Sequence, residues 1–276
     1  MKKLFEKLEL WIINKIRGFN GIMGLTFKDL TNSHEISINE NEVFPQGSVM
    51  KIPILIEVLK QAEEGKFKLT DKLKVKNEFK VGGSGILKDL KSEPELPIED
   101  LATLMIIISD NTATNMLIEL VGMEKVNETL RSYGFIKTRL QRKMMDFKAV
   151  KKGLENTSTP KEMMNLLEKI YYNEIISKKV CKKTLEIMKK TQYRQRIARY
   201  IPLNVEIAHK SGSIPGVCND VAIIFLQNRP YILCVMTKFI SDMEKTELEI
   251  AEISKQIYNI QARIATSTPL GHIITM

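Results

Sequence analysis

Cysteine and histidine are scarce in this chain of 276 residues, which contains three of each. Their positions are Cys181, Cys218, Cys234, His34, His209 and His272. The cysteine count is odd, no C-x-x-C spacing occurs, and the histidines show no metal-ligand grouping. We therefore expect no disulfide framework, no metal and no cofactor. Cys218 is either a reactive thiol or a small buried residue on a strand edge, and we favour the buried residue.

Long apolar runs, internal repeats and low-complexity segments are also missing from the sequence. Residues 2–17 have apolar positions at helical spacing with charges throughout, which predicts an amphipathic helix rather than a signal peptide with an uncharged core. We expect no membrane association. If Met1 is the natural start, we expect a cytoplasmic protein; if an export signal before Met1 was removed, the protein is exported.

A basic stripe interleaved with aromatic residues is not found, although the net charge is +9 from 42 basic and 33 acidic residues. Because the two signs are scattered along the chain, we expect a solvated basic surface that attracts anionic substrates, and no nucleic-acid binding. A monomer that acts on a small molecule is the expected state.

The most informative residues that are present are Ser48 and Lys51, in the segment FPQGSVMKIPILIEVLKQ. Residues three apart on a helix share a face, so the Lys51 amine can reach the Ser48 hydroxyl. Such an amine can take the proton of a serine that attacks a carbonyl. By itself the pair is a weak signal, because a helix cap and a solvated lysine have the same spacing.

Two further motifs follow in the chain. Residues 109–111 read Ser-Asp-Asn, after the apolar run LATLMIIIS and before the helical pattern TATNMLIELVG, which predicts a polar turn between two helices. The segment VEIAHKSGS ends a predicted strand with Lys210 and Ser211. A serine-lysine pair, a Ser-Asp-Asn turn and a Lys-Ser-Gly strand together match the motifs of serine β-lactamases and penicillin-binding proteins.

The chain resembles the class A β-lactamase family from about Phe44 to the C-terminus. Beyond the three motifs, residues 109–140 are similar to the corresponding family helices almost throughout. Residues 156–170, NTSTPKEMMNLLEKI, are similar to the segment that closes the family's omega loop and starts the next helix.

The order of predicted elements is helix, strands, helices, strands, helix. Residues 20–45 predict a hairpin, residues 48–200 are mainly helical, and strands are predicted at 205–212, 220–227 and 229–240 before a helix over 244–264. We therefore expect an α+β fold in which an antiparallel sheet from both chain ends packs against helices. One domain over 1–276 is expected, with a sheet-containing part (1–45 and 200–276) and a helical part (46–199), as the resemblance also implies.

The resemblance implies catalytic roles for Ser48, Lys51, Ser109 and Lys210. Ser48 would attack the carbonyl, Lys51 would accept its proton once burial near Lys210 lowers the lysine pKa, and Ser109 would relay the proton to the leaving group. Asp110 would order its turn.

Substrate contacts are expected from Asn111, Ser211, Gly212, Ser213 and Arg196. The Asn111 carboxamide would hold a substrate amide, and Lys210 with Ser211 would face a carboxylate. The backbone N–H groups of Ser48 and Ser213 would form the oxyanion hole. Arg196 is either a carboxylate-binding arginine, as in some family members, or a surface arginine.

The omega loop is where the sequence departs from the family. Class A enzymes have a glutamate and an asparagine there that hold the hydrolytic water, but residues 141–155 read QRKMMDFKAVKKGLE. Counting from Leu140 puts Met144 at or next to the place of the glutamate, and a thioether does not accept a proton at neutral pH. Asp146 and Glu155 are the carboxylates in this loop, and Asp146 is the favoured candidate for a deacylation base.

This departure favours acyl-enzyme formation over rapid turnover. The leading hypothesis is a β-lactamase-like serine hydrolase that opens β-lactams or cleaves related amides and esters through an acyl-Ser48 intermediate with slow deacylation. The alternatives are a D-Ala-D-Ala peptidase, penicillin-binding enzyme or esterase, and a sensor that is acylated by β-lactams or cell-wall fragments without turnover.

Residues 82–87, Gly-Gly-Ser-Gly-Ile-Leu, form a loop that the resemblance places opposite the Lys-Ser-Gly strand. A phosphate-binding loop is the competing interpretation, but it would need a lysine and a following helix start. In the favoured interpretation Ile86 and Leu87 lie nearest the groove, which predicts an apolar acyl pocket.

Overall fold

The structure is a computed structural model that describes residues 2–268 and 270–274. Its helices are α1 (Lys2–Arg17), α2 (Lys51–Glu63), α3 (Ile98–Ile107), α4 (Asn111–Val121), α5 (Met123–Ser132), α6 (Phe147–Lys151), α7 (Pro160–Tyr172), α8 (Lys178–Met188) and α9 (Met243–Ala265). Its strands are β1 (Ile22–Asp29), β2 (Glu35–Ile38), β3 (Phe44–Pro45), β4 (Lys72–Lys74), β5 (Glu95–Pro97), β6 (Thr157–Ser158), β7 (Ile207–Ile214), β8 (Val217–Ile224) and β9 (Tyr231–Lys238).

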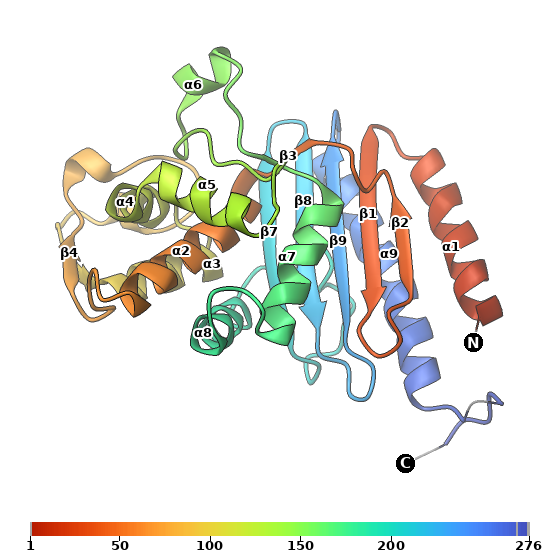
Figure 1. The fold of residues 1–276 in the computed structure, drawn as a ribbon. Coiled ribbons are helices and arrows are strands. Elements are labelled where there is room, and N and C mark those ends of the chain that lie inside the picture. Colours follow the sequence, from red (N-terminus) through yellow and green to blue (C-terminus); the bar gives the residue numbers. More distant parts are fainter. Residues whose placement is uncertain (1, 269, 275–276) are drawn as a thin grey trace.

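The main sheet has five antiparallel strands in the order β2-β1-β9-β8-β7. Strands from the two chain ends meet where β1 pairs with β9. Helix α7 covers one face, and α1 and α9 lie on the other, with the helices α2 to α5 beside the β7 edge (Figure 1). The predicted α+β class and the sheet built from both chain ends are confirmed.

The limits of the second predicted strand were wrong. We expected it over 220–227, but β8 covers Val217–Ile224. The chain reverses over Pro215 and Gly216, whose φ is +79°, so that Ile214 pairs directly with Val217. Glycine adopts a positive φ without steric cost, which allows this tight hairpin. All eight residues of β8 are buried, so no alternation of apolar and polar residues marks its start.

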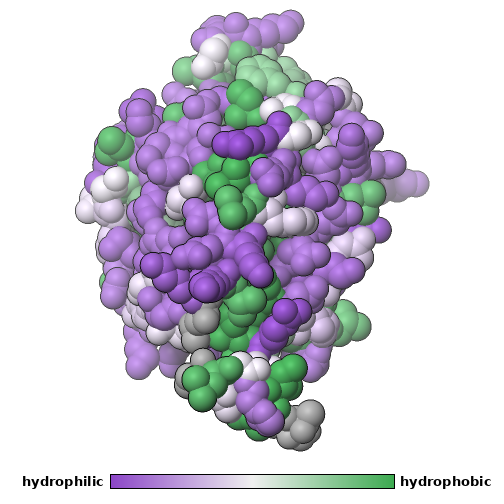
Figure 2. All heavy atoms as spheres, turned by 90° about the vertical axis from the view of Figure 1, so that its right-hand side faces the viewer, coloured by the Kyte–Doolittle hydropathy of each residue, from purple (hydrophilic) through white to green (hydrophobic). Residues whose placement is uncertain are grey.

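Two hydrophobic cores lie on the two faces of the sheet. One fills the helical part and the face under α7, and the other lies under α1 and α9. Seen from the side turned away from the helical part, the surface is mostly hydrophilic with a narrow apolar band (Figure 2). In the described residues no helix is long and apolar enough to cross a membrane.

Helix α2 is the centre of the helical part and begins at Lys51, directly after the turn that contains Ser48. Ten of its 13 residues are buried, among them the charged Lys51 and Glu57. Pro53 lies in its first turn, where the missing N–H would have no partner within the helix. Because α2 packs on α3, α4, α5 and α8, its first turn is held in a fixed place beside β7.

Candidate active site

Ser48 lies on a single 3₁₀ turn, Gly47–Met50, which leads directly into α2. The turn packs against β7 at Gly212, where a Cβ would overlap the carbonyl oxygen of Gln46 and lie 2.9 Å from Ser48 N. Gly47 has φ +54°, and a Cβ on it would lie 3.0 Å from Ser213 N. Two glycines therefore let the turn and the strand come close enough to bring the backbone nitrogens of Ser48 and Ser213 to one place.

Lys51 is completely buried behind this turn. Its Nζ donates hydrogen bonds to Ser109 O at 2.7 Å, Ser109 Oγ at 3.0 Å and Asn111 Oδ1 at 2.9 Å. In the part of the chain that the structure describes, Ser48 is not among its hydrogen-bond partners. Catalytic hydrogen bonds in enzymes without substrate are often long and tighten when the substrate binds.

Burial is also the main electrostatic influence on Lys51. It lowers the lysine pKa well below the ordinary value of 10.5, and the nearby charge of Lys210 lowers it further. Asp110 acts in the opposite direction but more weakly. A neutral amine is therefore accessible at Lys51 at a much lower pH than at an exposed lysine.

The turn between α3 and α4 presents Ser109 to this lysine. Ser109 has φ +58°, a conformation that costs a residue other than glycine about 1 kcal/mol or more. The Asp110 carboxylate caps α4 through Ala113 N at 2.9 Å and accepts the backbone N–H groups of Ile86 at 2.7 Å and Leu87 at 2.9 Å. Asp110 thus orders its turn, as expected, and also fixes the glycine-rich loop.

Two glycines of this loop, Gly83 and Gly85, are explained by their close contacts with Asn111 and Asp110. A Cβ on Gly85 would overlap the Asp110 carboxylate, and one on Gly83 would lie 2.5 Å from Asn111 Nδ2. Asn111 Nδ2 donates to Gly82 O at 3.0 Å. The Asn111 side chain therefore bridges Lys51 and this loop.

The expectation that Ile86 and Leu87 lie nearest the groove was wrong. Leu87 is buried in the core of the helical part, and Ser84 is the loop residue that lines the cleft. The two N–H bonds to Asp110 turn the chain away from the cleft after Gly85. On this side the cleft is therefore lined by the polar Ser84 and not by the predicted apolar pocket.

Lys210 lies on β7, opposite the turn of Ser48, and is completely buried. Its Nζ donates to Ser211 O at 2.7 Å. Burial lowers the pKa of Lys210 to about 7; Arg196 adds to this effect, and Asp220 opposes it. The Lys210 ammonium is therefore lost near neutral pH unless an anion binds beside it.

Arg196 is buried rather than a surface arginine. Its Nη1 donates to Gly212 O at 3.0 Å and to Asn219 O at 2.6 Å, and its Nη2 donates to Ser213 Oγ. Glu247 of α9 accepts from Arg196 Nη2 at 3.0 Å. The guanidinium is thus held against β7 by protein groups at the edge of the cleft.

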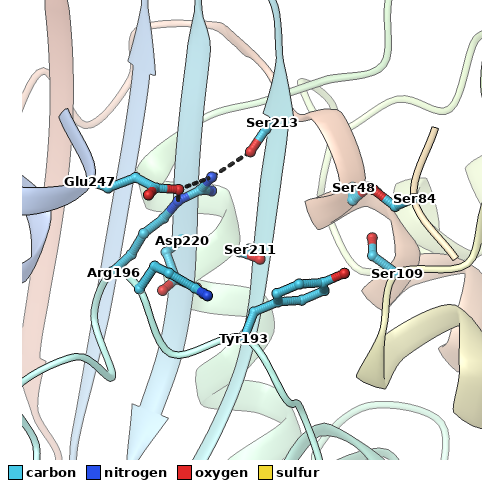
Figure 3. Close-up of a pocket in the computed structure, with 10 residues that line it drawn as sticks. Ser48, Ser84, Ser109, Tyr193, Arg196, Ser211, Ser213, Asp220 and Glu247 are labelled. Atoms are coloured by element: carbon cyan, nitrogen blue, oxygen red, sulfur yellow. Dashed lines mark hydrogen bonds and ion pairs between the residues drawn. The ribbon is translucent and has the colours of Figure 1, made fainter. Parts of the chain in front are cut away.

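A cleft of about 350 Å³ lies between the Ser48 turn, the Ser109 turn and β7, and the predicted residues Lys51, Asn111, Lys210 and Gly212 are not among those that line it. Its lining residues are Ser48, Ser84, Ser109, Tyr193, Gln195, Arg196, Ser211, Ser213, Asp220 and Glu247. Figure 3 shows Ser48, Ser84 and Ser109 gathered on the helical side, with the hydroxyl of Tyr193 pointing toward them from below. Five of these lining residues were not predicted from the sequence: Ser84, Tyr193, Gln195, Asp220 and Glu247.

The loop over 141–156 is closed at its base by side chains. Arg142 Nε donates to Glu155 Oε1 at 2.9 Å, and Asn156 Oδ1 accepts Gln141 N at 2.7 Å and Arg142 N at 3.0 Å. The Glu155 carboxylate is therefore held in an ion pair with Arg142 at the base of the loop.

Further along this loop, Met144 is buried, and its backbone N–H and carbonyl both bond to the Asn115 side chain, at 2.8 and 3.1 Å. Asp146 caps α6 by accepting Ala149 N at 2.9 Å. Helix α6 projects away from the body of the molecule (Figure 1). Asp146 is not among the described residues that line the cleft.

Cys218 is completely buried on β8, and burial raises the pKa of its thiol to about 12. The favoured interpretation of a small buried residue is confirmed, since a reactive cysteine needs a low pKa and exposure. Among the residues described, no group of three or more histidine, cysteine, aspartate or glutamate side chains is placed to hold a metal ion.

A profile described as "Beta-lactamase enzyme family" matches residues 6–261, which include every residue of this cleft. The chain belongs to the β-lactamase enzyme family. The β-lactamase VEB-1 of Pseudomonas aeruginosa is 27% identical over 275 residues, covering 94% of this chain and 89% of the relative. The β-lactamase SME-1 of Serratia marcescens is 29% identical over 245 residues, covering 86% and 83%.

Solved structures agree with this β-lactamase assignment. A β-lactamase of Sphaerobacter thermophilus superposes with a TM-score of 0.85 at 30% identity, covering 92% of this chain and 97% of that one. A protein named PBP-A superposes with a TM-score of 0.84 at 27% identity, covering 92% and 95%. A leucine-to-glutamate variant of PBP-A has been solved as an acyl-enzyme complex with penicillin G. The protein is a serine hydrolase of the class A β-lactamase type.

Proposed function

We propose that Ser48 of this β-lactamase-like hydrolase is acylated by β-lactams or related amides and esters, and that the acyl-enzyme is broken down slowly. The observation that most supports this proposal is the buried Lys51, which donates hydrogen bonds to Ser109 and Asn111 directly behind the Ser48 turn. A lowered lysine pKa next to a serine on a cleft wall is the arrangement that activates a weak nucleophile.

In the first step Ser48 Oγ bonds to the carbonyl carbon as its proton passes to the neutral Lys51 amine. A neutral amine has two N–H groups and one lone pair. It can keep its bonds to Ser109 O and Asn111 Oδ1 and still accept a proton with the lone pair. The negative charge on the carbonyl oxygen is stabilised by the backbone N–H groups of Ser48 and Ser213, each worth on the order of 3 kcal/mol.

In the second step the carbon–nitrogen bond of the substrate breaks, and the leaving nitrogen takes a proton. Ser109 Oγ, 3.0 Å from Lys51 Nζ, passes this proton from the lysine to the leaving group. The Asn111 carboxamide keeps one N–H for a substrate carbonyl, because its Nδ2 has two protons and Gly82 O accepts one.

The other end of the substrate lies along β7. A carboxylate there would accept from the hydroxyls of Ser211 and Ser213, which line the cleft, and would be attracted by the charge of the buried Lys210 beside them on the strand. Gly212 keeps the strand against the Ser48 turn. Arg196 reaches the same end, but Glu247 balances its charge. We infer that Lys210 supplies most of the attraction for a carboxylate and that Arg196 positions Ser213.

Slow deacylation is inferred from the loop over 141–156. Hydrolysis of an acyl-serine needs a base that activates water. Met144 stands near the place of the family's glutamate, Glu155 is bound to Arg142, and Asp146 caps α6. Asp146 stays a possible base, although its cap bond engages one carboxylate oxygen. The likeness to PBP-A supports a penicillin-binding enzyme as the second candidate function.

Pre-steady-state hydrolysis of a chromogenic β-lactam tests this proposal. We expect a burst of product equal to the enzyme concentration, followed by a steady rate well below one turnover per second, because breakdown of the acyl-enzyme limits the reaction. Asp146→Asn should lower that steady rate only if Asp146 is the base. Steady hydrolysis at roughly 10 to 10³ per second without a burst would refute slow deacylation.

A further inference from the structure

A second cavity lies at the far end of α2 from Ser48. It has a volume of about 970 Å³ and is formed by the end of α2, the loop over residues 65–70 and the first turns of α8. The 13 residues of α2 separate it from the catalytic turn by about 20 Å. Its volume is in the range of about 300 to 1,000 Å³ that small-molecule sites occupy.

The wall of this cavity is apolar. Leu59 and Val180 are buried at its base, and Phe67 and Leu69 are half-buried along its side. These side chains come from three segments of the chain and form one continuous hydrophobic lining. A groove of this kind has a lining suited to an alkyl chain, because burying apolar surface on both partners is favourable.

The rim of the cavity is basic. Its charged residues are Lys68, Lys178, Lys179, Lys182, Lys183, Glu63, Glu99 and Glu186. Lys183 forms ion pairs with Glu99 and Glu186. Lys178, Lys179 and Lys182 are exposed, and none of them takes part in an ion pair among the described residues. Positive charge is therefore in excess on the α8 side of the groove.

This arrangement is unfavourable for α8 itself. Lys178 and Lys182 are four residues apart, as are Lys179 and Lys183, and like charges at that spacing repel each other. The first turn of the helix contains no acidic residue, although acidic residues stabilise that end. An anion bound at the rim would relieve this repulsion.

We infer that the groove binds a long-chain fatty acid, with the alkyl chain along Phe67, Leu69 and Val180 and the carboxylate at Lys178, Lys179 and Lys182. A purely polar anion would leave the apolar wall in water, and a neutral lipid would leave the lysines without a partner. One ligand with an alkyl chain and an anionic head satisfies both parts of the groove.

Displacement of a fluorescent fatty acid, cis-parinaric acid, tests the inference. Palmitate should displace the probe, whereas hexadecanol and inorganic phosphate should compete at least tenfold more weakly. The double variant Lys178→Glu/Lys182→Glu should bind the probe at least tenfold more weakly. The matched control is Lys148→Glu/Lys152→Glu. It makes the same charge change at two exposed lysines that are also four residues apart and that lie beside the exposed apolar residues Phe147 and Val150.

Unchanged binding in the Lys178→Glu/Lys182→Glu variant, or a loss confined to the control variant, would overturn the inference. Equal competition by hexadecanol and palmitate would also overturn it, because the lysines would then play no part. A photoreactive palmitate should label peptides from residues 59–70 or 178–186, and labelling only elsewhere would contradict the site. Phe67→Ser gives a second variant that should weaken binding without a change of charge.

These measurements are independent of the proposed acylation. Ser48→Ala should bind the probe as tightly as the unaltered chain, because Ser48 lies at the other end of α2. Loss of probe binding in Ser48→Ala would place the fatty acid in the catalytic cleft and would overturn the inference. If only the proposed acylation of Ser48 fails its test, the inference that the groove binds a fatty acid still stands.

Discussion

Lys51 Nζ lies 2.7 Å from the carbonyl oxygen and 3.0 Å from the hydroxyl of Ser109. Both contacts depend on the positive φ of Ser109, which turns its main chain and its side chain toward the same buried amine. Lys51 thus stabilises a strained turn and is also the proposed acceptor of the Ser48 proton. Its two roles can be separated, because the first affects stability and the second affects acylation.

Lys51→Met removes the amine and keeps a long apolar side chain in its place. We expect acylation of Ser48 to slow by about 10²-fold or more, the scale of a lost general base. Stopped-flow measurement of acylation gives the rate, and thermal unfolding reports on the fold. An acylation rate equal to that of the unaltered chain would mean that another group accepts the Ser48 proton.

The pH dependence of acylation should have an acidic and an alkaline limb. The rate constant kcat/KM rises with pH as Lys51 loses its proton, at a pH well below 10.5. It falls again as Lys210, with a pKa of about 7 in the free enzyme, loses the charge that attracts a substrate carboxylate. A neutral ester substrate without a carboxylate is the control and should lack the alkaline fall. A fall of equal size for both substrates would contradict this role of Lys210.

Gly212→Ala should disrupt the contact between β7 and the Ser48 turn. The new Cβ would overlap Gln46 O, so the strand or the turn must move, and the two oxyanion-hole nitrogens separate. We expect a loss of about 10²- to 10³-fold in acylation rate. Gly18→Ala is the matched control, because a Cβ there meets its nearest atom at an ordinary 3.7 Å. An acylation rate in Gly212→Ala equal to that of Gly18→Ala and the unaltered chain would show that the close contact is not needed.

Met144→Glu tests whether a carboxylate at this position of the omega loop speeds up deacylation. The backbone of Met144 is fixed on both sides by the Asn115 side chain, so a new carboxylate would start from a defined position. We expect breakdown of the acyl-enzyme to accelerate by about 10²-fold or more, with little change in acylation. Met145→Glu places the same group one residue further on and should have a smaller effect. Faster breakdown in neither variant would argue against our assignment of the glutamate's place.

Much of the cleft could be predicted from short motifs, because each of them lies on one local element. The Ser48 turn, the Ser109 turn and the end of the Lys210 strand each occupy a few consecutive residues with a recognisable context. The ion pair between Arg196 and Glu247 could not be predicted in this way. Its partners are 51 residues apart, and Glu247 resembles any other glutamate on the polar face of α9.

Two other features depend on tertiary contacts that leave no local pattern. The direction of the glycine-rich loop is decided by two hydrogen bonds to Asp110, so Leu87 is turned into the core although it follows the loop directly. The start of β8 cannot be recognised from the sequence pattern, because both faces of that strand are buried. In each case a partner distant in sequence sets the local structure.

Intact-mass spectrometry after mixing with a penicillin tests the central claim most directly. The account predicts a single adduct with the mass of the whole penicillin that forms quickly, persists for minutes to hours and is absent from Ser48→Ala. An adduct on another serine in Ser48→Ala, or an adduct that forms and disappears within seconds, would contradict it.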